Sequence, residues 1–352
     1  MRDVMSQISF ETLALSWEPS LVFQAGELVY ANPPAEKLLE APAPGTDFTS
    51  LFGMELPEAD AAIAQLPLRG RSYDMSLRHL DDQVLVSLRL CSAGPLTLSD
   101  PMLVLLRDIQ AGLGLSVDRI REEAEAAENA AMRESARSLT RDQFRLSRIV
   151  NNAAVAANLL AGRQSCRPKL CIPEQLCASV LEALGYLLPE VKTEAHLLMH
   201  EPFPLDADLF KLLLMNLLAN SLDAGCRRLA LDLKADEDTL FLSLSDDGCG
   251  IAPEELPLVF DRFRHDYALS EMRRGAGLGL TVARGIAQLH GGTLLLESKP
   301  GEGTTVRVSF RRPSAEPEEL LLPEDSLFQA RDLLTGLVNH LSAELFDTVY
   351  LD

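Results

Sequence analysis

The chain has 352 residues, 47% of them hydrophobic and 24% charged, proportions that are ordinary for a folded globular protein. Its formal net charge is −20 at pH 7, and such an acidic surface repels the backbone of nucleic acids, which we therefore exclude as partners. At roughly 100–200 residues per domain, this length predicts two or three domains.

Several features bear on where the protein resides. Residues 1–13 contain acidic and polar side chains in place of the basic and apolar regions of a secretory signal peptide. No apolar run reaches the roughly 18–20 residues that cross a bilayer. The cysteines include no CxxC pair, which favours reduced thiols over a disulfide framework or a zinc site. We therefore expect a cytoplasmic protein with no membrane span.

Residues 8–110 are predicted to form a small α+β domain. Within residues 21–39, a strand, a glycine turn and a second strand precede a short helix that opens at Asn32. Alternating apolar residues predict three later strands, at 73–80, 83–93 and 102–110. This order of elements, with the YAN-x-x-AEKLL stretch, resembles a PAS domain; another small α+β fold is the alternative.

Residues 111–165 are rich in Ala, Glu and Arg, with neither glycine nor proline between Gly114 and Gly162. Apolar residues recur at steps of three and four, which is the pattern of an amphipathic helix. A break near residues 138–140 allows a helical hairpin, although one long helix is possible. Two such hairpins would pair as a dimeric four-helix bundle. A stripe that merely faces a core is the alternative and would not imply a dimer.

Residues 166–312 carry the motifs that point to chemistry, and the first motif is a predicted helix at 209–224. Asn216 and Asn220 lie four residues apart and so share one face of this helix. A buried amide without a partner costs about 1–3 kcal/mol, so both side chains need one. An asparagine carbonyl is a suitable ligand for Mg²⁺, and structural hydrogen bonding is the alternative role.

The second motif begins with a predicted strand that ends at Asp246. The tight turn Asp247-Gly248-Cys249-Gly250 follows, and glycine permits positive φ and close approach of a ligand to the backbone. A carboxylate at a strand end can accept a hydrogen bond from an exocyclic amine such as that of adenine. On its own, the motif could equally be an ordinary turn.

The third motif is a glycine-rich loop, Gly275-Ala276-Gly277-Leu278-Gly279, that runs directly into a predicted helix ending near His290. Such a loop presents backbone N–H groups and the positive end of the helix dipole to an anion. The loop lacks the Gly-Lys-Ser/Thr of a P-loop and the GxGxxG that follows a strand in dinucleotide-binding folds. A strand hairpin follows, and His290 is expected to cap the end of the helix.

Taken in order, and with the stretch LVFDRF at 258–263, these motifs resemble the N, first glycine, F and second glycine boxes of the histidine-kinase branch of the GHKL ATPases. The resemblance implies an α/β sandwich that binds ATP and Mg²⁺, with a mobile lid at 261–276. The nucleotide-binding residues that it implies are Asn216, Asn220, Asp246, Gly248, Gly250, Gly275, Gly277, Leu278, Gly279 and Thr304, with Asn220 as the Mg²⁺ ligand.

The order of PAS-like domain, helical hairpin and ATP-binding domain is also that of sensor histidine kinases. The resemblance therefore implies two-component signalling by a homodimer that acts with a response regulator or another signalling protein in trans. Residues 313–352 read as an acidic linker and a final helix, for which the sequence predicts no role.

One feature departs from the family pattern. No histidine lies between Leu80 and Ala195, so the hairpin has no phosphoacceptor and we assign no catalytic residue. In related hydrolases a glutamate stands four residues before the metal-binding asparagine as general base; here that residue is Asn216, which cannot take a proton. The competing hypotheses are a kinase with a non-standard or in-trans acceptor, a pseudokinase that regulates a partner as an ATP-gated dimer, and a serine/threonine kinase of the anti-sigma type.

Overall fold

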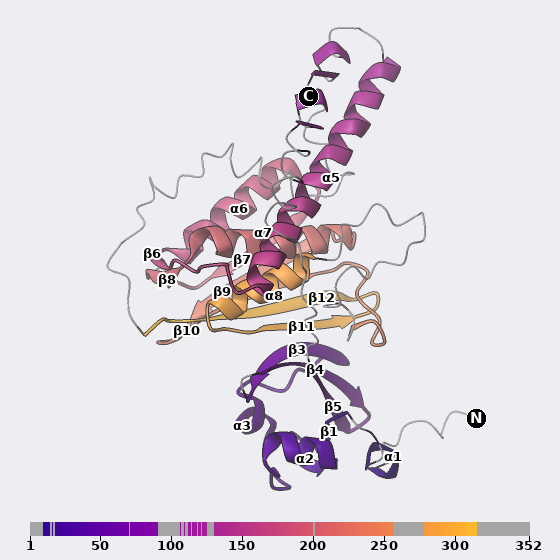
Figure 1. Ribbon diagram of the computed structural model, residues 1–352, viewed down its shortest axis with the longest axis vertical. Coiled ribbons are helices and arrows are strands. Elements are labelled where there is room, and N and C mark those ends of the chain that lie inside the picture. Colours follow the sequence, from indigo (N-terminus) through magenta and orange to yellow (C-terminus); the bar gives the residue numbers. More distant parts are fainter. Residues whose placement is uncertain are drawn as a thin grey trace, which may run out of the picture.

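The computed structural model describes residues 18–69, 71–90, 130–199, 201–256 and 278–314, with Val259 and scattered positions in 10–16 and 106–124. The chain folds into two α/β halves that share a 10-stranded sheet, in the order β2-β1-β5-β4-β3-β11-β12-β10-β9-β7, while β6 and β8 pair in a separate two-stranded sheet. Figure 1 shows the N-terminal half below the C-terminal half, with α5 rising beside the helices of the latter. None of the helices in the described part of the chain is long and apolar enough to cross a membrane.

The N-terminal half is an antiparallel sheet with short helices on one side. Its elements are α1 (Phe10–Ala14), β1 (Ser20–Gln24), β2 (Glu27–Ala31), α2 (Pro33–Leu39), α3 (Phe48–Phe52), β3 (Ala61–Leu68), β4 (Arg71–Leu80) and β5 (Gln83–Leu90). The predicted helix opening at Asn32 is confirmed, because this side chain caps α2 by accepting a hydrogen bond from the backbone N–H of Ala35. Asn32 also accepts from the N–H of Ser20, which ties the start of α2 to β1.

The set of three later strands was predicted only in part. β4 and β5 match the strands expected at 73–80 and 83–93. The strand that pairs with β4 on its other side is β3, which precedes both in the chain and was not predicted. The predicted strand at 102–110 lies mostly outside the described residues, and it is wrong at the two positions that are described, Leu106 and Ile109, which are helical.

The strand β3 was not predicted from the sequence because both of its faces are buried. Ala61 and Ile63 belong to the hydrophobic core of the C-terminal half, whereas Ala62 and Ala64 belong to that of the N-terminal half. A strand buried on both faces shows no alternation of apolar and polar residues, which was the signal used for its neighbours.

The predicted helical segment contains α5 (Ala130–Leu160), and the described residues between 112 and 124 are helical as well. α5 runs without interruption through Ser138, Leu139 and Thr140, so the predicted break at these residues is wrong and the alternative of a long helix holds there. Ser and Thr have only moderately lower helix propensity than alanine and do not end a helix by themselves. The dimeric four-helix bundle stays a prediction.

The C-terminal half is a mixed sheet backed by helices, as predicted. Its elements are β6 (Lys169–Cys171), α6 (Pro173–Leu187), β7 (Lys192–Leu197), β8 (Phe203–Leu205), α7 (Ala207–Asp223), β9 (Arg228–Ala235), β10 (Thr239–Asp246), α8 (Gly279–Leu289), β11 (Leu294–Lys299) and β12 (Gly303–Arg311). β7 pairs with β9 in parallel and the other pairs are antiparallel. The helices α6, α7 and α8 lie on one face of the sheet (Figure 1).

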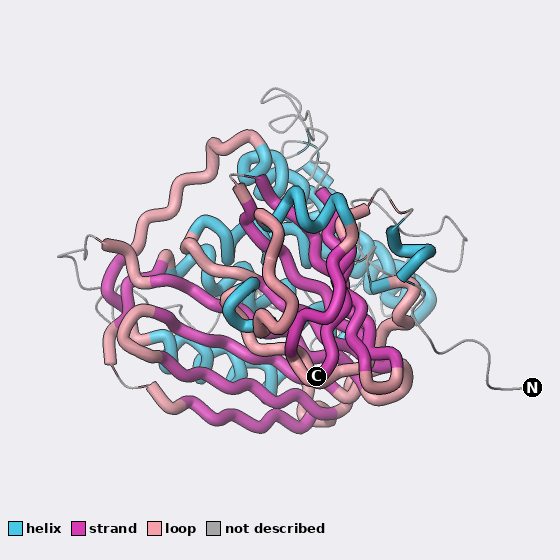
Figure 2. Tube along the Cα trace, turned by 90° about the horizontal axis from the view of Figure 1, so that it is seen from below, coloured by secondary structure: helices cyan, strands magenta, loops and turns pink. Residues whose placement is uncertain are grey.

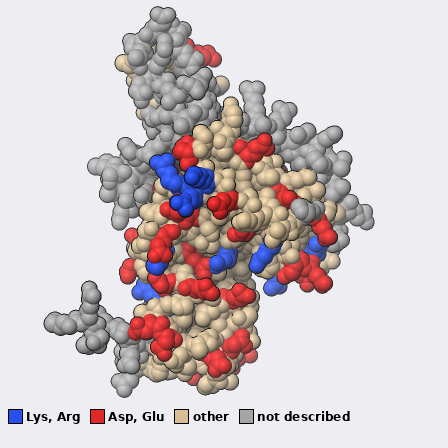
Figure 3. Space-filling view, turned by 180° about the vertical axis from the view of Figure 1, so that it is seen from behind, with Lys and Arg blue, Asp and Glu red and all other residues tan. Residues whose placement is uncertain are grey.

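The two halves join edge to edge where β3 pairs with β11 in antiparallel fashion, from Leu295 opposite Ala64 to Glu297 opposite Ala62. Figure 2 shows the strands of both halves together from below. Figure 3 shows acidic side chains on both halves, whereas Lys and Arg gather mainly over the C-terminal half. The pairing of β3 with β11 places the N-terminal half directly against one edge of the larger sheet.

Candidate functional site

The helix α7 carries both asparagines of the first motif. It begins at Asp206, whose side chain accepts a hydrogen bond from the N–H of Leu209. Asn216 is 1% exposed, and its Nδ2 donates to the carbonyl oxygen of Leu212 at 2.9 Å. Its Oδ1 accepts from Nδ2 of Asn152, a residue of α5, also at 2.9 Å. The Asn216 amide is therefore held from both sides.

Asn220, one turn further along α7, is half-buried. Its Nδ2 is shielded from solvent and has no hydrogen-bond partner among the described residues. A buried amide without a partner is unfavourable by about 1–3 kcal/mol, which a bound ligand would relieve.

Asp246 ends β10 and faces α7. Its Oδ2 accepts a hydrogen bond from the Ser221 hydroxyl at 2.7 Å, so the residue after Asn220 is joined directly to the carboxylate. Its Oδ1 accepts from the backbone N–H groups of Gly248 at 2.9 Å and Thr304 at 3.3 Å. Burial raises the pKa of Asp246 above its usual range, in spite of these hydrogen bonds.

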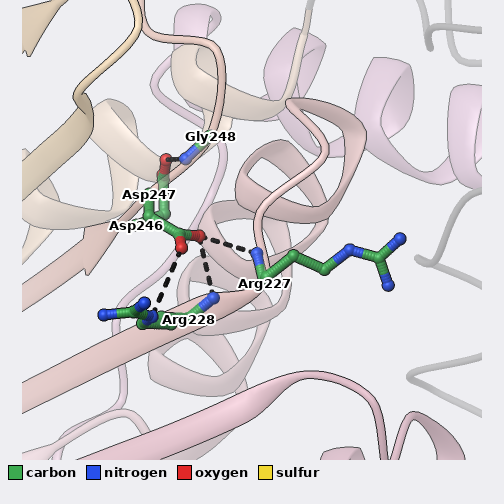
Figure 4. Close-up of polar contacts among 5 residues, drawn as sticks. All are labelled: Arg227, Arg228, Asp246, Asp247 and Gly248. Atoms are coloured by element: carbon green, nitrogen blue, oxygen red, sulfur yellow. Dashed lines mark hydrogen bonds and ion pairs between the residues drawn. The ribbon is translucent and has the colours of Figure 1, made fainter.

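The turn after Asp246 is fixed by the next carboxylate, Asp247. Its Oδ1 accepts from the backbone N–H groups of Arg227 at 2.6 Å and Arg228 at 2.8 Å. These hydrogen bonds lower the pKa of Asp247. Figure 4 shows the two aspartates pointing in different directions, Asp246 toward Gly248 and Asp247 toward the arginine backbone. Asp247 thus anchors the turn and leaves Asp246 to face the site.

Three glycines of the motifs stand where an added Cβ would meet close neighbours. A Cβ at Gly248 would lie 2.8 Å from the Cβ of Ala224, and one at Gly250, where φ is +67°, would lie 2.1 Å from the carbonyl oxygen of Lys299. A Cβ at Gly279 would come within 3.0 Å of Oδ1 of Asn216 and 3.4 Å of Oδ1 of Asn220. The start of α8 is therefore packed directly against both asparagine amides.

Thr304 and Ser298 connect the strand hairpin to the same site. The Thr304 hydroxyl lies 2.9 Å from that of Ser298. Ser298 in turn accepts from the N–H of Ile251 at 2.8 Å, beside the glycine turn, and donates to the carbonyl oxygen of Gly303. This buried serine ties β11, β12 and the turn together.

The structure brings most of the predicted site residues to one end of α7 and α8. These residues are Asn216, Asn220, Asp246, Gly248, Gly250, Leu278, Gly279 and Thr304. Gly275, Gly277 and the predicted lid at 261–276 lie outside the described residues. The sequence missed Ser221, Ser298 and Asn152, because single serines and a distant asparagine carry no motif.

His290 occupies the C-cap of α8, as predicted. Its Nδ1 lies 2.9 Å from the carbonyl oxygen of Ile286, and its Nε2 lies 3.2 Å from the backbone N–H of Asp206. Since Nε2 faces a donor, Nδ1 must carry the proton. Burial lowers the pKa of His290, in agreement with a neutral ring.

The geometry suits an anionic ligand with an amine at its other end. The N-terminus of α8, which no side chain caps among the described residues, brings the positive end of a helix dipole beside the two asparagines. Asp246 supplies a fixed acceptor across the site.

Residues 205–314 match the family model of the histidine kinase-, DNA gyrase B- and HSP90-like ATPases. These residues form an ATPase domain of the histidine-kinase family. Their bounds start just before α7 and end just after β12, so the ATPase domain contains every predicted site residue.

Relatives match the chain over limited stretches. The chain is 35% identical over 120 residues to the sensor histidine kinase WalK of Bacillus subtilis (strain 168), covering 33% of this chain and 19% of WalK. It is 28% identical over 195 residues to the sensor protein KdpD of Escherichia coli (strain K12), covering 54% of this chain and 21% of KdpD. The chain therefore spans about a fifth of the length of these relatives. The solved structure of the Acinetobacter baumannii histidine kinase AdeS is 17% identical, covers 57% of this chain and 96% of that chain, and has a TM-score of 0.43.

Proposed function

We propose that the ATPase domain binds Mg-ATP and that the chain is a phosphotransferase of the two-component signalling class. The observation that carries the proposal is the hydrogen bond between Ser221 and Asp246, which joins the asparagine helix to the carboxylate at the strand end. This hydrogen bond holds α7 against the end of β10, and the start of α8 packs against the same asparagine amides. Bound Mg-ATP would need these groups close together.

The proposed roles follow the chemistry of each group. Asp246 accepts a hydrogen bond from the adenine amine, and Thr304 supports that side of the site. Gly248 and Gly250 shape the adenine wall. The phosphate groups lie at the loop that opens α8, which contains Gly275, Gly277, Leu278 and Gly279.

Asn220 is the proposed metal ligand, with Asn216 beside it on the same helix face. Oxygen ligands from amides suit Mg²⁺, which would neutralise part of the triphosphate charge when bound. An acidic chain needs such a local source of positive charge, because its net charge of −20 disfavours a triphosphate. The chain's own contribution is to bind and orient the nucleotide.

A pseudokinase is the second candidate, and a sequence observation favours it. The segment from Leu80 to Ala195 contains no histidine, and α5 lies within it. Under this alternative the nucleotide sets the shape of a dimer that regulates a partner, and no phosphoryl group is transferred to the chain.

Further parts of the proposal concern the whole molecule. We propose a PAS-like sensor role for residues 8–110, a cytoplasmic homodimer built through the helical segment at 111–165, and a response regulator or other signalling protein as partner in trans. The domain limits of 166–312 for the ATP-binding part and 313–352 for the acidic tail belong to the same proposal.

Incubation with γ-labelled ATP, alone and with a panel of purified receiver domains, tests the choice between the two candidates. Acid-labile label on the chain or on a receiver would establish phosphotransfer and remove the pseudokinase. Nucleotide binding without any label would support the pseudokinase. The absence of both binding and label would contradict both.

A further inference from the structure

Asn152 lies on α5, outside the ATPase domain, yet its side chain reaches the nucleotide site. The residue is 4% exposed, and its Nδ2 donates to Oδ1 of Asn216 at 2.9 Å. The same Asn216 oxygen is the nearest atom to the position where a Cβ of Gly279 would stand. The contact therefore connects α5 to the point where α7 meets the start of α8.

Two further contacts hold α5 in this place. One turn before Asn152, Arg148 pairs with Asp223 of α7 at 2.8 Å, and both side chains are largely buried. Two helical turns after Asn152, the Leu159 side chain fills the space beside Gly285 of α8. A Cβ added at Gly285 would lie 2.9 Å from this side chain. Figure 1 shows α5 running beside α7 and α8. The position of Asn152 is thus set by packing on both sides of it.

Each of the three helices carries one buried polar atom without a partner. Among the described residues, Oδ1 of Asn152 on α5, Nδ2 of Asn220 on α7 and Oγ1 of Thr281 on α8 are shielded from solvent and make no hydrogen bond. Buried polar atoms are rarely left unpaired in folded proteins, and a bound water, ion or ligand is one way to pair them. Asn152 contacts Asn216, and Asn216 and Asn220 both lie beside Gly279, so a group bound there could pair with the first two.

We propose that Asn152 is a positioning residue of the nucleotide site, supplied by α5. It fixes the Asn216 amide from one side and offers its own Oδ1 to the bound nucleotide and metal. This inference rests on the proposed function. Because the contact crosses from α5 to the ATPase domain, docking of α5 and binding of Mg-nucleotide stabilise each other, and thermodynamic linkage makes the effect reciprocal.

Two variants of the full chain separate this role from simple packing. Asn152→Leu keeps the side-chain volume and removes the amide, and Asn152→Ala serves as a second variant. Asn151→Leu is the matched control, since it makes the same change at the neighbouring, half-buried position of α5, whereas the Asn216 amide bonds to Asn152 and Leu212. The affinity for a non-hydrolysable ATP analogue is measured by calorimetry with Mg²⁺ and with EDTA.

We expect Asn152→Leu to reduce the Mg²⁺-dependent gain in affinity by about five- to tenfold, the effect of losing one hydrogen bond. The affinity in EDTA should change by less than about twofold, and Asn151→Leu should keep the Mg²⁺-dependent gain within about twofold of the unmodified chain. Hydrogen exchange gives a second readout: Mg-nucleotide should slow exchange of α5 in the unmodified chain and leave it unchanged in Asn152→Leu.

The inference is overturned if both Asn152 variants retain the full Mg²⁺-dependent gain, or if Asn151→Leu loses as much of it. An unmodified chain that binds no nucleotide at all would instead overturn the proposed function. The two failures are therefore distinguishable in one set of titrations.

Discussion

At the residue scale, burial of the Asp246 carboxyl affects the stability of the folded protein. It receives hydrogen bonds from Ser221, Gly248 and Thr304, yet burial still raises its pKa. A carboxyl whose pKa is raised in the folded state is more stable protonated, so its contribution to stability falls as pH rises from 3.8 through the folded-state pKa. At neutral pH the ionised group therefore weakens the free protein.

Replacement of Asp246 by Asn should keep the size of the side chain and remove this buried charge. We expect the melting temperature of the free protein to stay the same or rise, while ATP affinity falls about tenfold or more because the acceptor for the adenine amine is weakened. Asp247→Ala is the control: it should lower the melting temperature, since Arg227 and Arg228 lose their acceptor, and leave affinity nearly unchanged. Thermal melts and calorimetry check both, and a large drop in melting temperature with unchanged affinity for Asp246→Asn would contradict the assignment.

His290 makes a second prediction at this scale, about pH. Its folded-state pKa lies below 6.5, so the unfolded chain takes up a proton first and stability falls as pH drops below about 6.5. Protonation would also place a hydrogen on Nε2, which faces the N–H of Asp206. We expect His290→Gln to flatten the stability profile between pH 7.5 and 5.5 measured by denaturant unfolding. His196 is exposed, and we expect His196→Gln to leave the stability profile unchanged. Equal profiles for the unmodified chain, His290→Gln and His196→Gln would refute this assignment.

Among the elements, those that carry a recognisable sequence pattern were predicted, and those that depend on contacts between distant parts of the chain were not. The strand β10 and the helix α8 agree with the expected strand end at Asp246 and helix end near His290, and α7 and the β11–β12 hairpin were also predicted. β3 was missed because two cores bury it, and the break in α5 was wrongly placed because Ser and Thr alone do not end a helix. The contact of Asn152 with Asn216 joins residues far apart in sequence, and no local pattern could predict it.

The helix α8 allows a matched test of two glycines. Gly279 faces the asparagine amides and Gly285 faces Leu159 of α5. Gly279→Ala should reduce nucleotide affinity about tenfold or more with little loss of stability, because alanine favours the helix while its Cβ displaces the amides. Gly285→Ala should loosen α5 and lower the melting temperature, with a smaller effect on affinity. If Gly279→Ala binds nucleotide as tightly as the unmodified chain, the phosphate groups do not lie at this end of α8.

For the whole molecule, an ion pair and a hydrogen bond add to the pairing of β3 with β11 where the two halves join. Arg284 of α8 pairs with Asp74 of β4 at 2.9 Å, and both side chains are less than one-fifth exposed. Arg78 of β4 donates to the carbonyl oxygen of Pro253, just after the glycine turn of the site. The N-terminal half therefore contacts both α8 and the segment that follows the glycine turn.

Removal of one partner of the Arg284–Asp74 pair should destabilise the join. We expect Arg284→Met to lower the free energy of unfolding by about 1–3 kcal/mol, because Asp74 would be left largely buried without this partner. Arg69→Met, which breaks an exposed pair with Glu40, should have little effect. Chemical denaturation measures both, and a double-mutant cycle with Asp74→Leu isolates the pair. Equal effects of Arg284→Met and Arg69→Met would show that the join does not depend on this contact.

The central claim is that α7, β10 and the start of α8 form one metal-dependent nucleotide site. Calorimetric titration of the full chain with a non-hydrolysable ATP analogue, with and without Mg²⁺, tests it most directly when repeated on Asn220→Ala. We predict that the unmodified chain binds more tightly with Mg²⁺ and that Asn220→Ala loses this gain while keeping its metal-free affinity. Binding that does not depend on Mg²⁺ in the unmodified chain, or a full Mg²⁺-dependent gain in Asn220→Ala, would contradict the account.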